Sequence, residues 1–233
     1  MKNKYLLLFI SLILLLYPIT SFSSSWSRME SGTNSDLIAI WGSSGTDVFA
    51  VGGDFDGENY HGTILHYDGD TWSPMVIDTT STLVGVWGSS GRDVFAVGYN
   101  GTILHYNGST WSSMTSGTTN SLFGVWGSSG RDVFAVGYGG TILHYNRLTW
   151  SAMSSGTKYT LRGVWGCSRN NVFAVGDGTI LHYNGLTWSA MEQYYIPVYS
   201  IWGSSGSDVF AVSHYQICTV VDDESNNSGK EEK

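Results

Sequence analysis

The sequence predicts an all-β protein, a five-bladed β-propeller of four-stranded blades. The first observation is a Trp-Gly pair that returns at Trp41, Trp87, Trp126, Trp165 and Trp202, so a unit of about 39 residues repeats. The second is that each unit holds four short apolar runs separated by Gly-containing turns, which is the strand content of one blade. The third is composition: 14% aromatic and 13% charged residues with 30 glycines suit tightly turned β-structure.

The second unit shows the expected strands most clearly. They cover residues 83–88, 93–98, 102–106 and 110–114. The first turn reads Ser-Ser-Gly-Arg, in which Gly91 is expected to take a positive φ. The pair Asn100-Gly101 predicts a hairpin turn after the second strand.

The strands are apolar on both faces. Val94-Phe95-Ala96-Val97 shows no alternation, which indicates a sheet covered by neighbouring sheets on both sides. The residue two before each Trp is always small, and we expect it where first strands crowd around the axis. These residues are Ala39, Gly85, Gly124, Gly163 and Ser200.

The two ends of the repeat region complement each other. The last unit lacks a fourth strand, whereas Ser25-Trp26-Ser27-Arg28-Met29 matches the fourth strand at residues 110–114. We therefore expect the ring to close by pairing this N-terminal strand with the C-terminal blade, which removes exposed sheet edges. The alternative is that the chain is a shortened member of a longer repeat array.

The remaining segments predict export. Lys2 and Lys4 precede an apolar run over residues 5–19, and Ser21-Phe22-Ser23 offers a cleavage site, so residues 1–23 are expected to be a signal peptide. An uncleaved anchor is the alternative. The propeller domain is expected over residues 24–221 and a disordered polar tail over 222–233. The protein is then secreted, periplasmic or held at the cell surface, with no membrane span after cleavage.

The formal net charge of -8 and the lack of a basic stripe disfavour nucleic acid, and no nucleic-acid partner is expected. The two cysteines, Cys167 and Cys218, replace Ser and Leu of other units and are read as independent substitutions, with a disulfide between them as the alternative.

The stretch Trp-Gly-Ser-Ser-Gly to Gly-Thr-Ile-Leu-His-Tyr-Asn-Gly-x-Thr-Trp resembles repeats of secreted bacterial β-propellers. These are similar to the Asp-box repeats of sialidases and to photosystem II stability/assembly-factor-like propellers. Gly108-x-Thr110-Trp111 fits the end of the Asp-box pattern, but Tyr106 stands where Asp is expected. The resemblance covers about residues 25–221 and implies a propeller without implying an activity.

An enzyme is not expected. Sialidases resemble each other in an arginine triad, and the arginines here do not form an obvious convergent set. Aspartates recur at the start of the second strand, where we expect their carboxylates to accept turn N–H groups. Histidines recur in the third strand, where a ring of metal ligands is the alternative to a structural role. These residues are Asp47, Asp93, Asp132, Asp208, His66, His105, His144 and His182.

The predicted function is a non-enzymatic interaction or scaffold module that acts as a monomer on a protein or glycan partner. The tryptophans are expected between blades. The alternative is a lectin-like carbohydrate binder using rim Trp and Tyr side chains, and a sialidase-like glycosidase ranks below it.

The first unit carries a seven-residue insertion that includes Asp54, Asp56 and Glu58. Oxygen ligands at alternate positions with a Gly turn resemble part of a calcium loop, so these three residues are the candidate Ca²⁺ ligands. A solvated acidic loop is the alternative.

Overall fold

The computed structural model describes residues 25–220, so the predicted signal peptide and the tail at 222–233 lie outside the described residues. The chain divides into two compact units at Glu30. In the first unit, residues 25–30 contain no strand and are exposed. The second unit begins at Ser31 and holds all the secondary structure described below. No helix in the described part of the chain is long and apolar enough to cross a membrane.

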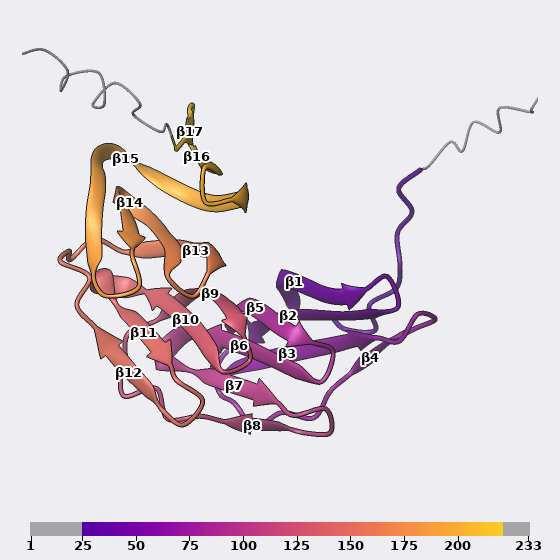
Figure 1. Ribbon diagram of the computed structural model, residues 1–233. Coiled ribbons are helices and arrows are strands. Elements are labelled where there is room, and N and C mark those ends of the chain that lie inside the picture. Colours follow the sequence, from indigo (N-terminus) through magenta and orange to yellow (C-terminus); the bar gives the residue numbers. More distant parts are fainter. Residues whose placement is uncertain (1–24, 221–233) are drawn as a thin grey trace, which may run out of the picture. The chain divides into compact units, whose positions relative to one another are not determined.

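Three sheets contain four antiparallel strands each, in sequence order (Figure 1). The first repeat has β1 (Asp36–Ser44), β2 (Asp47–Phe55), β3 (Tyr60–Tyr67) and β4 (Trp72–Pro74). The second has β5 (Leu83–Ser90), β6 (Asp93–Gly98), the 3-10 turn η1 (Tyr99–Gly101), β7 (Ile103–Tyr106) and β8 (Trp111–Ser113). The third has β9 (Leu122–Ser129), β10 (Asp132–Gly137), η2 (Tyr138–Gly140), β11 (Ile142–Tyr145) and β12 (Trp150–Met153).

The last sheet has five strands because one strand is shared. It contains β13 (Leu161–Ser168), β14 (Asn171–Tyr183), β15 (Trp188–Ser205), β16 (Asp208–Ser213) and β17 (Ile217–Thr219). Residues 188–193 of β15 pair with β14, whereas residues 198–205 pair with β16. The strand therefore ends the fourth repeat and begins a last repeat that has three strands.

The predicted closure of a five-bladed ring is not confirmed. Residues 25–30 take no strand, and Trp26 is fully exposed. Within residues 25–220, β17 pairs with β16 and with no other strand. The four-stranded antiparallel repeat itself is confirmed in the first three sheets.

The turns differ in part from expectation. Asn100 and Gly101 take φ values of 56° and 71°, as the hairpin prediction requires. However, β5 continues to Ser90, so the preceding turn is shorter than predicted, and Gly91 does not take a positive φ. Glycine is needed there for space, because a Cβ at Gly91 would overlap the Asp47 carboxylate of the preceding repeat.

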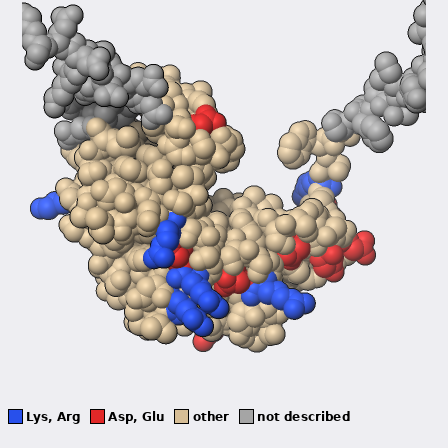
Figure 2. Space-filling model, in the orientation of Figure 1, with Lys and Arg blue, Asp and Glu red and all other residues tan. Residues whose placement is uncertain are grey.

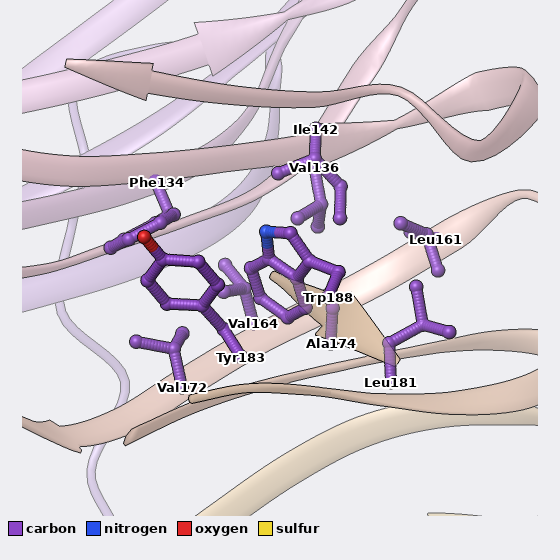
Figure 3. Packing of buried hydrophobic residues seen from close by; sticks show 10 residues of the cluster. All are labelled: Phe134, Val136, Ile142, Leu161, Val164, Val172, Ala174, Leu181, Tyr183 and Trp188. Atoms are coloured by element: carbon purple, nitrogen blue, oxygen red, sulfur yellow. The ribbon is translucent and has the colours of Figure 1, made fainter. Parts of the chain in front are cut away.

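The core lies between consecutive repeats, as the apolar strands predicted. Val94, Phe95, Ala96 and Val97 are completely buried. Figure 3 shows Trp188 among side chains of both the third and the fourth repeat. Only 13% of the residues are charged, and the surface in view in Figure 2 shows correspondingly few Lys, Arg, Asp and Glu side chains.

The Trp-Gly pair forms a repeated contact between repeats. A Cβ on Gly127 would lie 2.7 Å from the ring of Trp87 and 2.8 Å from the carbonyl oxygen of Asp132. Only glycine leaves room for the indole of the preceding repeat. The same contact joins Trp41 to Gly88, Trp126 to Gly166 and Trp165 to Gly203.

The first strands of neighbouring repeats approach closely, as the small residues before each Trp predicted. A Cβ on Gly124 would lie 3.2 Å from the carbonyl oxygen of Arg162 and 3.3 Å from the Cα of Gly163. A larger side chain at this position would push two repeats apart.

Candidate functional site

A Ser–Asp–His network recurs in the first three repeats. In the second repeat, the Ser89 hydroxyl donates to Asp93 Oδ2 at 2.5 Å, and His105 Nε2 lies 2.7 Å from Asp93 Oδ1. The equivalent networks are Ser43–Asp47–His66 and Ser128–Asp132–His144.

Strand register produces this network. Ser89 is the penultimate residue of β5, and Asp93 begins β6. His105 in β7 pairs with Phe95 and stacks on its ring, with centroids 4.4 Å apart. The prediction that the Asp93 carboxylate accepts N–H groups of its turn is wrong, because its hydrogen-bond partners are Ser89 and His105. The carboxylate binds a hydroxyl and an imidazole on the two adjacent strands, because the short turn brings the ends of β5 and β6 together.

The order of the three groups decides what they can do. In a nucleophilic triad the imidazole lies between the hydroxyl and the carboxylate and removes the hydroxyl proton. Here the carboxylate of Asp93 lies in the middle, and His105 binds the other carboxylate oxygen from Ser89. The arrangement fixes three strand ends and does not activate a hydroxyl.

Burial and hydrogen bonds shift the pKa of two members of these networks, Asp47 and His182. Burial acts to raise the pKa of Asp47, but hydrogen bonds from Ser43 and His66 outweigh it and hold this pKa below its usual value. In the fourth repeat Asn171 replaces the aspartate and lies 2.9 Å from His182 Nε2. Without a carboxylate, burial lowers the pKa of His182.

The last two repeats depart from the network further. Cys167 stands where the serine is in other repeats, and both Cys167 and Cys218 are unpaired. In the last repeat Ser204 still binds Asp208, but Thr219 pairs with Phe210 where a histidine is expected. Metal binding by a ring of histidines therefore has no support, because each histidine is bound to its own repeat.

The inserted acidic loop follows β2. Asp56 Oδ1 accepts the backbone N–H groups of Glu58 and Asn59, both at 2.8 Å, and Asp56 Oδ2 lies 2.8 Å from His61 Nε2. The bonds from Asn59, Glu58 and His61 lower the pKa of Asp56 to about 2. Asp54 is the penultimate residue of β2, so it lies in the strand before the loop.

Among the described residues, no three His, Cys, Asp or Glu side chains gather in a way that could hold a metal ion. Calcium binding by Asp54, Asp56 and Glu58 stays a prediction, which a calcium-dependent rise in melting temperature would test.

A groove of about 630 Å³ lies between the outer strands of the first and second repeats. Its wall combines the segment after β4 with the start of β8, and includes Pro74, Met75, Val76, Ile77, Ser109 and Trp111. The indole Nε1–H of Trp111 donates to Met75 Sδ at 3.2 Å, which joins the two sides. The exposed surface of the lining is mainly apolar, and His66 and Asp78 can make polar contacts.

This groove arises from a local departure from the repeat. Val76-Ile77 occupies the place of Thr115-Ser116 and Ser154-Ser155, so apolar side chains replace hydroxyls after the fourth strand. Val76 is 94% exposed. Sequence reasoning overlooked the pair, although aligning the linkers between repeats would have identified it.

The tryptophans are mostly engaged in packing. Trp150 and Trp188 are buried, and Trp72 and Trp111 are half-buried. Trp188 Nε1 has no hydrogen-bond partner among the described residues. Trp26 and Trp202 are exposed, and both lie in the segments for which closure was predicted. A row of exposed rim tryptophans for stacking on sugars is therefore not present in the described repeats.

No protein-family profile and no curated protein matches the sequence. Among solved structures, the chain is similar to YCF48 bound to D1 peptide, with 17% identity, a TM-score of 0.63 and coverage of 86% of this chain and 70% of that one. YCF48 from Cyanidioschyzon merolae gives 13% identity, a TM-score of 0.59 and coverage of 80% and 66%. U3-55K gives 12% identity, a TM-score of 0.62 and coverage of 77% of this chain and 59% of that one.

These likenesses show the fold alone, and the chain spans less than two thirds of the second and third of these proteins. The β-propeller repeat fold is thereby confirmed, as is its similarity to photosystem II assembly-factor-like propellers. They do not test secretion or the Asp-box resemblance.

Proposed function

We propose that this chain is a non-enzymatic β-propeller that binds a protein partner, and that the groove beside Val76 is the docking surface. The observation that carries the proposal is the Val76-Ile77 pair, which stands where the second and third repeats carry hydroxyls and the fourth carries Glu192-Gln193. Val76 exposes apolar area beside Trp111. Met75, Val76 and Trp111 form an apolar wall suited to an extended segment with apolar side chains.

The similarity to YCF48, a propeller solved with a D1 peptide, supports a peptide-sized partner. The recurring Asp and His side chains hold strands together within each repeat. Binding is then expected at places where one repeat differs from the others.

The finer architecture belongs to the same proposal. We infer a closed ring of five blades, monomeric and exported. Trp202 is 60% exposed, and a Cβ on Gly42 would meet only atoms of its own sheet, the nearest being Val48 Cγ2 at 3.0 Å. Trp202 on Gly42 would repeat the contact made at every internal junction.

The segment at Trp26 would supply the missing fourth strand. At two junctions, the Met that follows or ends one fourth strand accepts from the Trp that begins the next: Met75 accepts from Trp111, and Met114 accepts from Trp150. Met29 stands at the end of the N-terminal segment as Met75 and Met114 follow β4 and β8, so in the proposed ring it would be the counterpart of these acceptors.

Peptide selection tests the docking surface. A random peptide library is selected on the wild-type protein and counter-selected on Val76→Asp. Because Val76 is almost wholly exposed, the variant should keep its melting temperature while it loses the selected peptides. Leu148→Asp, at an 81% exposed position of another repeat, is the matched control and should keep binding. Peptides that bind the wild type and Val76→Asp equally would contradict the proposal.

A further inference from the structure

A second cavity, of about 310 Å³, lies where the third and fourth repeats meet. Its lining includes Ser128, Arg131, His144, Asn146, Arg147 and Arg169. Residues 25–220 contain seven Lys and Arg residues, and three of them line this one cavity. Figure 2 shows several of the basic side chains gathered in one area of the surface in view.

Arg147 occupies a backbone position made for glycine. Its φ is 82°, whereas the same turn in other repeats carries Gly69, Gly108 and Gly185, with φ of 101°, 93° and 93°. Side chains other than Gly, Asn and Asp rarely adopt this conformation, and residues held in it gather at ligand sites. The chain therefore keeps an arginine here against a backbone preference that the other repeats satisfy.

Arg169 also stands where other repeats have glycine. Its counterparts include Gly91 and Gly130, where a Cβ would overlap the aspartate carboxylate of the preceding repeat. At this junction that aspartate is Asp132, whose side chain is 12% exposed, against 28% for Asp93. Two independent replacements of glycine thus bring arginines to the same cavity.

The three guanidinium groups lack carboxylate partners among the described residues. The arginine ion pairs there are Arg28–Glu30 and Arg162–Asp177. Asp132, the carboxylate in the cavity lining, is already bound by Ser128 and His144. Three arginines against one aspartate leave a formal charge of +2 in a protein whose net charge is -8.

We propose that this cavity binds a phosphate or sulfate monoester, whose oxyanion is held by Arg131, Arg147 and Arg169. Guanidinium groups match tetrahedral oxyanions because two parallel N–H groups bind two oxygens. The cavity volume leaves room for the group that carries the ester. Asn146, whose side chain accepts from the backbone N–H groups of Leu148 and Thr149, fixes the turn that carries Arg147.

Isothermal titration of the whole chain at low ionic strength tests the proposal, with inorganic phosphate, inorganic sulfate and phenyl phosphate as probes. Saturable binding to one site is expected, and the relative affinities of the three probes separate phosphate from sulfate and show whether the carrier group contributes. Arg147→Gly restores the glycine of the other repeats, so its melting temperature should be unchanged or higher. Its affinity should fall roughly tenfold to hundredfold, as should that of Arg169→Gly.

Arg92→Ala is the matched control, because Arg92 holds the position of Arg131 in the preceding repeat, where the neighbouring turn has Gly108. Its affinity should equal that of the wild type. An equal loss in Arg92→Ala would show general attraction to a basic surface and overturn the proposal, as would absence of saturable binding to the wild type.

Discussion

The same Trp and Gly residues occur at the junction between the second and third repeats and at the two ends of the repeat array. They are in contact at the junction and, among the described residues, lack that contact at the ends. At the junction, Trp87 packs on Gly127. At the ends, Trp202 is 60% exposed, and no indole of residues 25–220 lies against Gly42. The difference shows that each repeat is built with one side to insert and one side to receive. The ends are thus suited to each other, which is the physical basis of the proposed ring.

The largest effect is expected from removing the indole that packs on the glycine of the next repeat. Trp87→Ala should lower the free energy of unfolding by about 4 kcal/mol, because a large, partly buried ring that packs on Gly127 is lost and a cavity remains. In a closed ring, Trp202→Ala should approach the same loss. Urea unfolding at equilibrium measures both, and a loss below about 1 kcal/mol for Trp202→Ala would mean an open array.

Enlarging the smallest contact residue comes next. Gly124→Leu should cost about 3 kcal/mol, because its side chain would meet the backbone at Arg162 and Gly163. Ser200→Leu makes the same test at the exposed equivalent in the last repeat, and closure predicts a comparable loss. An unchanged melting temperature for Gly124→Leu would refute close packing of first strands.

Trp26→Ala should cost about 2 kcal/mol if its segment completes the last repeat, since it then loses a half-buried ring. Ser27→Ala, which alters the same segment without removing the ring, should be neutral. The measurement is the thermal midpoint of each variant. Equal midpoints for the wild type and Trp26→Ala would leave the segment without a structural role.

The smallest effect concerns the fourth repeat, whose Asn171 makes its junction unlike the others. Asn171→Asp should raise the pKa of His182, because the imidazolium gains a carboxylate partner. In the wild type this pKa is lowered, so the site's contribution to stability is present above the unfolded value of about 6.5 and is lost as pH falls below it. The variant should lose less stability on acidification. NMR titration of the imidazole checks the pKa, and an unchanged value would contradict this account.

The sequence predicted most of the fold because the repeat displays its own strand boundaries and turn residues. Asn100-Gly101 and the run at Val94 were interpreted correctly since each depends on local chemistry. The role of Gly91 was misjudged because the clashing atom, Asp47 Oδ2, belongs to another repeat. The partners of Asp93 were missed for a similar reason, because His105 reaches it through strand register. The candidate sites at Val76 and Arg147 were overlooked although both are visible as departures from the repeat.

The Trp-Gly contact also bears on how the chain folds. The second and third repeats present the same Trp, Gly and Asp at their edges, so Trp87 could dock on Gly166 of the fourth repeat almost as well as on Gly127. Chain connectivity favours the correct neighbour only weakly, since doubling a loop costs about 0.6 kcal/mol. A molecule that skips one repeat would bury the same groups and escape slowly. Near-identical repeats therefore simplify the native structure at the risk of kinetic traps during folding.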